Sequence, residues 1–212
     1  MIRLRLHCKR LGATGLLLVL SACAALKPSD TPQPAYYTLD GLPVARTSGA
    51  ARSGPTLIIG LPAAAAGYDS QRILYVREPH RLEYFAHSEW VDPPARMIAA
   101  ALLAALQNHA AFGAVVGASG SAWGDLRLDT ELVRLQHDFQ ARPSQVVLTL
   151  RATLVQDKAR RVLTVRQVEA RVPSASEDPP GGVQAANLAL QQVLTDLSTF
   201  LTEAAGSLPR VD

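Results

Sequence analysis

The clearest hydrophobic pattern in the chain is an alternation of apolar and polar positions that begins after Asp125 and predicts a long β-strand with one buried face. The first inward positions lie two residues apart: Leu126, Leu128, Thr130 and Leu132. The phase then shifts by one residue, to Val133, Leu135 and Phe139. An extra residue in a strand produces such a shift, so we expect a β-bulge near Leu132 and Val133.

Two further alternating stretches follow this strand and predict an antiparallel hairpin. In residues 144–156 the inward positions are Leu148, Leu150, Ala152 and Leu154. A polar turn, Lys158-Ala-Arg160-Arg161, leads into the second stretch, which ends near residue 172. The basic residues of this turn have an alternative role, the binding of anionic groups.

Shorter strands are predicted where β-branched and aromatic runs are bounded by Gly, Pro and Asp. These runs are residues 35–41, 56–62, 72–78 and 81–87. The Gly- and Ser-rich stretch 113–125 is expected to form a turn. His80 and His87 are expected in loops and His137 in a strand.

Two amphipathic helices complete the pattern. The first is predicted over about residues 92–109, with Asp92 as the N-cap and Pro93 in the first helical position. Its apolar stripe is Ile98, Leu102, Ala105 and His109. The second is predicted over about residues 183–204, after a break at 173–182. Its apolar positions recur every three or four residues: Val183, Ala186, Leu190, Val193, Leu197 and Phe200.

Together these elements predict an α+β fold. We expect a mostly antiparallel sheet with a long C-terminal hairpin, packed against two main helices at about 92–109 and 183–204.

The N-terminus has the organisation of an export signal. A basic segment containing four Lys and Arg residues precedes a short apolar run, Leu11 to Leu20. The run ends at Leu20-Ser21-Ala22-Cys23, which resembles the lipobox of bacterial lipoproteins. That resemblance implies cleavage before Cys23, a diacylglyceryl group on its thiol and acylation of its amino group, for example by palmitate. The alternative is an ordinary signal peptide cut nearby, which leaves Cys23 free.

The predicted organisation is a signal peptide over 1–22, an acylated cysteine with a Pro-rich tether over 23–35, one periplasmic domain over 36–206 and a short tail over 207–212. Twelve tether residues extended like polyproline reach on the order of 35 to 40 Å. Removal of the signal, with its four basic and no acidic residues, changes the formal charge from +3 to −1. We therefore expect no nucleic-acid binding.

Candidate catalytic and metal-binding patterns are incomplete, so we predict no enzymatic activity, no metal and no cofactor. Ser119 lacks the second glycine of a nucleophile elbow, because Ser121 stands in its place. The histidines of the mature chain do not have the spacing of a helical zinc site. Glu177 and Asp178 are adjacent carboxylates, but nothing in the local sequence separates their pKa values.

Several stretches, in order, resemble one family, the auxiliary lipoprotein components of ABC-type transport systems, which include PqiC-like outer-membrane lipoproteins. They are the segment Tyr-Tyr-Thr-Leu-Asp-Gly ending at Gly41, the middle region with Tyr68-Asp69, Ile73 to Arg77 and Trp90, the long hairpin and the closing helix. The chain departs from the family pattern at Tyr68-Asp69, where a Leu is usual between Tyr and Asp.

The resemblance implies a periplasmic α+β domain on the outer membrane that works with an ABC permease, an ATPase and a mammalian-cell-entry (MCE) type protein in lipid transport. Ala24 after the cysteine fits outer-membrane sorting. We expect a docking subunit, in which Tyr68, Asp69, Tyr84 and Trp90 contact the MCE partner, and a homo-oligomer would suit this role. In the alternative, Tyr84 and Trp90 pack the first helix onto the sheet. Other functional classes are a structural envelope lipoprotein and a soluble-domain lipid carrier.

Overall fold

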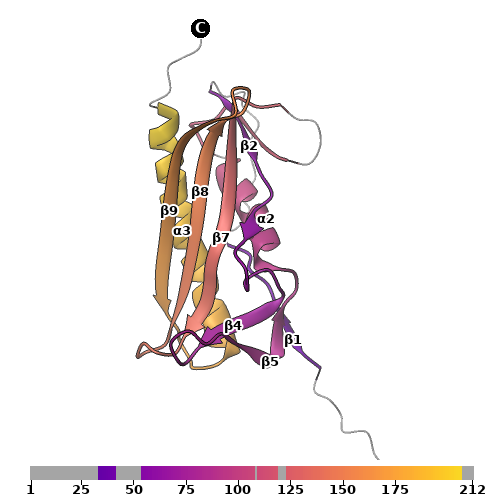
Figure 1. The fold of residues 1–212 in the computed structure, drawn as a ribbon, viewed down its shortest axis with the longest axis vertical. Coiled ribbons are helices and arrows are strands. Elements are labelled where there is room, and N and C mark those ends of the chain that lie inside the picture. Colours follow the sequence, from indigo (N-terminus) through magenta and orange to yellow (C-terminus); the bar gives the residue numbers. More distant parts are fainter. Residues whose placement is uncertain (1–32, 42–53, 108, 119–122, 207–212) are drawn as a thin grey trace, which may run out of the picture. The chain divides into compact units, whose positions relative to one another are not determined.

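Three long antiparallel strands form the centre of the fold in this computed structural model, which describes residues 33–41, 54–107, 109–118 and 123–206 (Figure 1). The strands are β7 (Leu126–Asp138), β8 (Gln145–Gln156) and β9 (Arg161–Pro173). β8 pairs with both neighbours along nearly its whole length. The predicted α+β class and the long C-terminal hairpin are confirmed, and the basic turn joins β8 to β9 as expected.

The predicted β-bulge is also confirmed. The pairing of β7 with β8 shifts register between Leu132 and Arg134, so Val133 is the extra residue. Leu132 and Leu135 consequently both lie in the core. A second register shift lies between Leu154 and Val155 of β8, opposite the start of β9. The first bulge lets β7 keep its apolar positions on the buried face on both sides of the irregularity.

The other edge of β7 carries three short parallel partners at successive positions along its length. They are β2 (Thr56–Ile59), β3 (Ala63–Ala64) and β4 (Arg72–Val76). β6 (Ala114–Gly117) lies beyond β2, and β5 (Glu83–Trp90) and β1 (Ala35–Tyr37) lie beyond β4. The sheet is therefore mixed, with its long pairs antiparallel and its short pairs mostly parallel.

Two local predictions about these short strands were wrong. Residues 114–117 form β6 instead of a turn, because their backbone pairs with β2, a strand more than fifty residues earlier. His87 lies within β5 instead of a loop, since that strand continues to Trp90. Neither long-range pairing leaves a signal in the local sequence.

The first helix, α2 (Pro94–Leu106), is shorter than predicted. Asp92 is not its N-cap; Pro93 occupies that position in an extended conformation, without a side-chain cap. A residue before a proline is disfavoured in the helical region, so Pro94 moves the helix start by one residue. Asp92 instead lies 3.5 Å from Arg96, one turn along the helix. His109 lies beyond the helix end.

The second helix, α3 (Pro179–Gly206), starts four residues earlier than predicted. The Asp178 carboxylate accepts a hydrogen bond of 2.9 Å from the backbone N–H of Gly181, which is an N-cap bond. Pro179 then stands at the first helical position, where its missing N–H costs nothing. Pro179 and Pro180 lie in the predicted break at 173–182, but they belong to the first turn of α3.

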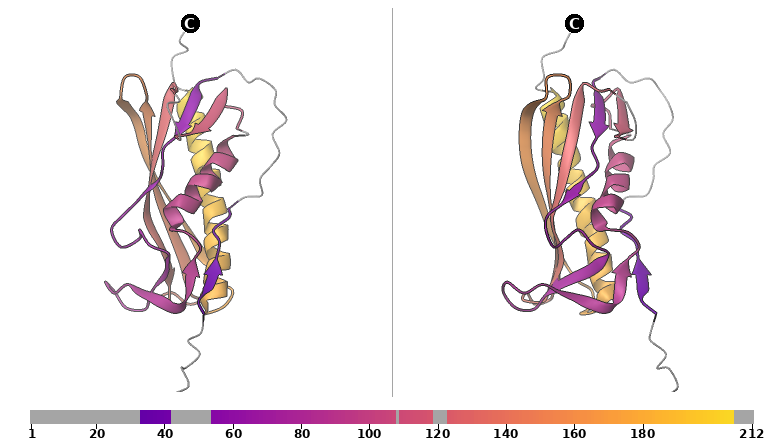
Figure 2. Two further views of the ribbon diagram at one scale, coloured as in Figure 1. Left: turned by 90° about the vertical axis from the view of Figure 1, so that its right-hand side faces the viewer. Right: turned by 45° about the vertical axis from the view of Figure 1, so that its right-hand side comes forward.

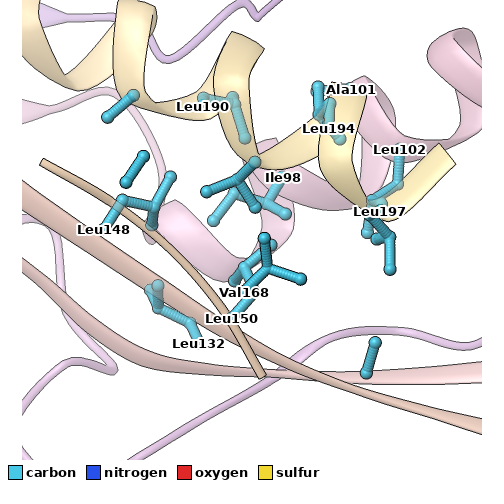
Figure 3. Packing of buried hydrophobic residues seen from close by; sticks show 14 of the residues in the cluster. Ile98, Ala101, Leu102, Leu132, Leu148, Leu150, Val168, Leu190, Leu194 and Leu197 are labelled. Carbon is cyan, nitrogen blue, oxygen red and sulfur yellow. The ribbon is translucent and has the colours of Figure 1, made fainter. Parts of the chain in front are cut away.

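Both helices cover the same face of the sheet (Figure 2). α3 packs on β8 and β9, whereas α2 packs on β2, β6, β7 and α3. Leu148 and Leu150 of β8 point toward Leu190 and Ile98 of the helices (Figure 3). These side chains are almost fully buried and form one continuous hydrophobic core.

The segment after β1 is fastened to α3. The side-chain amide of Asn187 accepts a hydrogen bond of 2.9 Å from the backbone N–H of Asp40 and donates one of 3.2 Å to the carbonyl of Thr38. Leu39 is buried between these contacts. Gly41 follows with φ of +65°, and a methyl group on it would lie 3.1 Å from Cβ of Ala101. The first folded residues after the predicted tether are thus held by α3 as well as by β5.

Candidate functional site

The four residues predicted to contact a partner lie at the β1–β5–β4 end of the sheet. Tyr68 and Asp69 belong to the loop before β4, Tyr84 lies in β5, and Trp90 is the last residue of β5. Their exposure differs sharply: Tyr84 is 50% exposed and Trp90 only 3%. Asp69 is exposed and Tyr68 is half-buried.

Tyr68 joins the loop to the sheet. Its hydroxyl donates a hydrogen bond of 2.7 Å to Oε1 of Gln136 on β7, and its ring packs against the core. Burial raises the pKa of the Tyr68 hydroxyl, an effect that the nearby charge of Arg134 partly opposes. Tyr68 therefore positions the loop and holds Asp69 at the surface beside it.

Tyr84 is the centre of an exposed apolar surface. It lies directly opposite Leu74 of β4, and the guanidinium carbon of Arg72 lies 4.1 Å above its ring. Leu82, two residues before it, is also exposed, and a methyl group on Gly67 would lie 3.6 Å from Cδ1 of Leu82. We call Arg72, Leu74, Leu82 and Tyr84 the β4–β5 surface. A cation above a tyrosine ring fixes its orientation and leaves its edge free.

Charged pairs border this surface. Glu83 accepts hydrogen bonds from Nε and Nη2 of Arg77, at 2.9 and 2.6 Å, and lies 3.5 Å from Arg81. The hydrogen bonds from Arg77 lower the pKa of the Glu83 carboxyl. An apolar centre with a polar rim is the usual composition of a protein-binding patch.

Trp90 belongs to the core. Its backbone N–H donates to the carbonyl of Gln71 at 2.7 Å, and Nε2 of Gln71 donates to the carbonyl of Val91 at 2.8 Å. These bonds fix the chain just before α2. Trp90 therefore agrees with the alternative in which it packs the first helix onto the sheet. Tyr84 is exposed and does not agree with that alternative. The proposed contact surface does not include Trp90.

Two of the hollows among the described residues bear on the candidate site. A cavity of about 10 Å³, with room for about one water, lies under the sheet beside Trp90 and His137. An open groove of about 540 Å³ runs between α2 and α3. Its lining contains four hydroxyl side chains: Thr195, Ser198, Thr199 and Thr202.

One buried pair has the residue types of a nucleophile and its base. Nε2 of His137 lies 2.8 Å from Oγ of Ser144, and Glu177 accepts a hydrogen bond of 3.1 Å from the backbone N–H of Ser144. Both side chains are buried, and burial lowers the pKa of His137. A nucleophile must reach its substrate. The geometry therefore fits a structural contact between β7, β8 and the start of α3.

Over the described ranges, three or more His, Cys, Asp and Glu side chains nowhere converge as metal ligands. In the same part of the chain, neither helix has the length and apolarity to cross a membrane. Cys23, the predicted lipid attachment site, lies outside the described residues and stays a prediction.

Sequence reasoning missed most of the β4–β5 surface. Arg72, Leu74 and Leu82 become neighbours of Tyr84 through the pairing of β4 with β5. Within each segment, residues two positions apart share a face, so Arg72 lies with Leu74 and Leu82 with Tyr84. The sequence pattern does not show which of the two faces is exposed. The pairing of His137 with Ser144 was missed too, because a buried polar contact leaves no periodic signal.

Comparison with known proteins gives one family. The family model described as ABC-type transport auxiliary lipoprotein component matches residues 37–198. This span contains β2 through β9, α2, the β4–β5 surface and most of α3. A comparison with curated proteins gives no match.

Solved structures share the fold. The crystal structure of protein XCC0632 from Xanthomonas campestris has a TM-score of 0.70 and 23% identity, and the match covers 81% of this chain and 97% of that one. The hypothetical protein CT253 from Chlamydia trachomatis has a TM-score of 0.53 and 6% identity, covering 74% of this chain and 100% of that one. At these identities the likeness concerns the fold alone.

Proposed function

Because the chain belongs to the family of ABC-type transport auxiliary lipoprotein components, we propose that it docks an MCE-type periplasm-spanning protein at the outer membrane, as a non-enzymatic subunit of a lipid transport system. The observation that carries this proposal is the β4–β5 surface. It presents two half-exposed side chains, Tyr84 on β5 and Leu82 just before that strand, at the edge where β5 pairs with β4. Aromatic residues in such settings often dominate protein binding.

The predicted anchor supports a docking role. Acyl chains on Cys23 would each contribute about 0.8 kcal/mol per buried methylene and would hold the domain at the membrane. β1 starts twelve residues after Cys23, so the β1–β5–β4 end of the domain is the end nearest to the anchor along the chain. A tethered domain meets a nearby partner at a high effective concentration.

The competing functional classes fit less well. A lipid carrier needs an apolar cavity large enough for an acyl chain, whereas the hollow beside Trp90 and His137 holds about one water. The open groove between the helices is exposed to solvent and has four hydroxyl side chains in its lining. A purely structural lipoprotein does not require the exposed apolar β4–β5 surface. A homo-oligomer remains compatible with docking.

Photo-crosslinking in intact cells tests the proposed contact. Tyr84 is replaced by p-benzoylphenylalanine, which keeps an aromatic ring at the position, and cells are irradiated before the acylated protein is isolated. The control places the same residue at Leu188, an exposed leucine of α3. We expect the MCE-type protein to be joined to position 84 and not to position 188. Equal or absent crosslinking at both positions would count against the β4–β5 surface.

A further inference from the structure

A second exposed apolar cluster lies at the opposite end of the long hairpin. Val155 of β8 is paired directly with Val162 of β9, and Thr153 with Val165. Val162 and Val165 are 56% and 55% exposed. Directly opposed residues share one face of a sheet. Leu154 lies between Thr153 and Val155 in the sequence and is buried in the core. Because neighbouring residues of a strand point to opposite faces, the two valine pairs lie on the face that points away from the helices.

An exposed tryptophan lies just before β7, at the same end of the sheet. Trp123 is 81% exposed and lies two residues before Asp125. The carbonyl of Asp125 accepts a hydrogen bond of 3.1 Å from the backbone N–H of Asp157, the first residue of the β8–β9 turn. The start of β7 is therefore next to the turn, and Trp123 belongs to the segment that leads into it. We call Trp123, Val162, Val165 and the turn residues Lys158 and Arg161 the hairpin tip.

The hairpin tip carries positive charge. Lys158, Arg160 and Arg161 are all exposed. The nearby Asp157 is already paired with Arg127, at 2.8 Å between carboxylate oxygen and guanidinium nitrogen. Further along the same face, opposite charges are matched, as in the pair of Glu131 with Arg151. The tip thus combines exposed apolar side chains with basic turn residues.

The hairpin tip is remote from the point where the chain enters the domain. β4 pairs with the last residues of β7, whereas the tip adjoins its first residues. β7 has 13 residues, which corresponds to a length of about 40 Å. β1 and the β8–β9 turn consequently lie at opposite ends of the sheet (Figure 1).

We propose that the hairpin tip is a second contact surface, which binds a segment of the MCE-type partner with acidic residues next to apolar ones. This inference rests on the proposed function and adds a surface to it. Trp123 and the two valines would lose water-exposed apolar area in the contact, and the basic turn would pair with the acidic residues. Interface energies concentrate in such Trp and Arg positions. The charge component makes binding weaker in high salt.

A binding titration tests the second surface. The full acylated protein, in detergent, is titrated with the purified periplasmic part of the MCE-type protein at low and high salt. The double variant Trp123→Ser and Val165→Lys should bind at least about tenfold more weakly than the wild type, as expected for interface hot spots. Lys158→Glu and Arg161→Glu should bind more weakly and show a smaller dependence on salt.

The matched control is Leu188→Lys, which places the same charge at an exposed leucine of α3. It should bind like the wild type. Thermal unfolding of each variant shows that the fold is kept, and every substituted side chain is exposed in the wild type.

The outcomes separate the two proposals. If the wild type binds and the tip variants bind equally well, the hairpin tip is not a contact surface, although docking stands. If the wild type does not bind, both proposals fail. Vesicles containing anionic phospholipid form a further arm. If the tip variants lose vesicle binding while partner binding is unchanged, the tip is a lipid-binding surface and the inference is wrong.

Discussion

Nε2 of His137 and Oγ of Ser144 lie 2.8 Å apart in a part of the interior where both side chains are almost completely buried. The contact joins the end of β7 to the residue that precedes β8. Glu177 holds the backbone of Ser144 from the other side, just before α3 begins. Three segments of the fold are therefore fixed by one polar cluster behind the β4–β5 surface.

This cluster makes folding stability depend on pH. Burial lowers the pKa of His137, although the carboxylates of Glu177, Asp178 and Asp138 attract the proton and partly oppose the shift. The unfolded chain therefore binds this proton at a higher pH than the folded chain. As the pH falls through about 6.5, unfolding takes up a proton and stability decreases. Denaturant midpoints should be lower at pH 5.5 than at pH 7.5.

The variant His137→Gln isolates this effect. Glutamine does not titrate, so its midpoint should change less over the same interval. The pKa values of Glu177 and Asp178 are lowered from ordinary values of 4.5 and 3.8, so their stabilising contributions are lost only at lower pH. An equal decrease in the variant and the wild type would show that His137 is not the responsible group.

Gly182 lies against the same imidazole. A methyl group on Gly182 would stand 2.6 Å from Nδ1 of His137, too close for any side chain. Gly182→Ala should therefore destabilise the protein by roughly 1–3 kcal/mol, although alanine favours helix more than glycine does. Urea unfolding measures the change. Gly206→Ala, with no atom within 4 Å of the added methyl group, is the control and should be nearly neutral.

Asn187 fastens the first folded segment to α3, and Asn187→Ala should weaken this attachment. The backbone N–H of Asp40 and the carbonyl of Thr38 would lose their partner. Both bonds are exposed, so each is expected to contribute about 0.5–1.5 kcal/mol. In hydrogen exchange, amides near Leu39 should exchange faster. Thr195→Ala removes only an exposed bond within α3 and should leave these amides unchanged.

The central strands could be predicted because their apolar positions repeat in sequence. The phase change after Leu132 even located the bulge, since an extra residue in a strand must shift the alternation. The short parallel strands on the other edge of β7 could not be assigned partners, because their pairing depends on residues far away in the chain. β6 was mistaken for a turn for that reason.

Prediction from the sequence was limited in a similar way at the candidate site. Tyr84 was predicted as a contact and is exposed, but Trp90 from the same region is buried, and aromatic character alone does not distinguish the two. The turn after Asp157 was predicted from its polar residues. The exposure of Val162 was not, because the register shift between Leu154 and Val155 places it on the same face as Val165.

Recovery of the partner from membranes tests docking most directly. The acylated protein, carrying a C-terminal affinity tag, is isolated from cell envelopes in mild detergent, and bound proteins are identified by mass spectrometry. We predict that the MCE-type protein of the same transport system is recovered with it. A preparation in which the acylated protein is intact and abundant but the MCE-type protein is absent would contradict the proposed function.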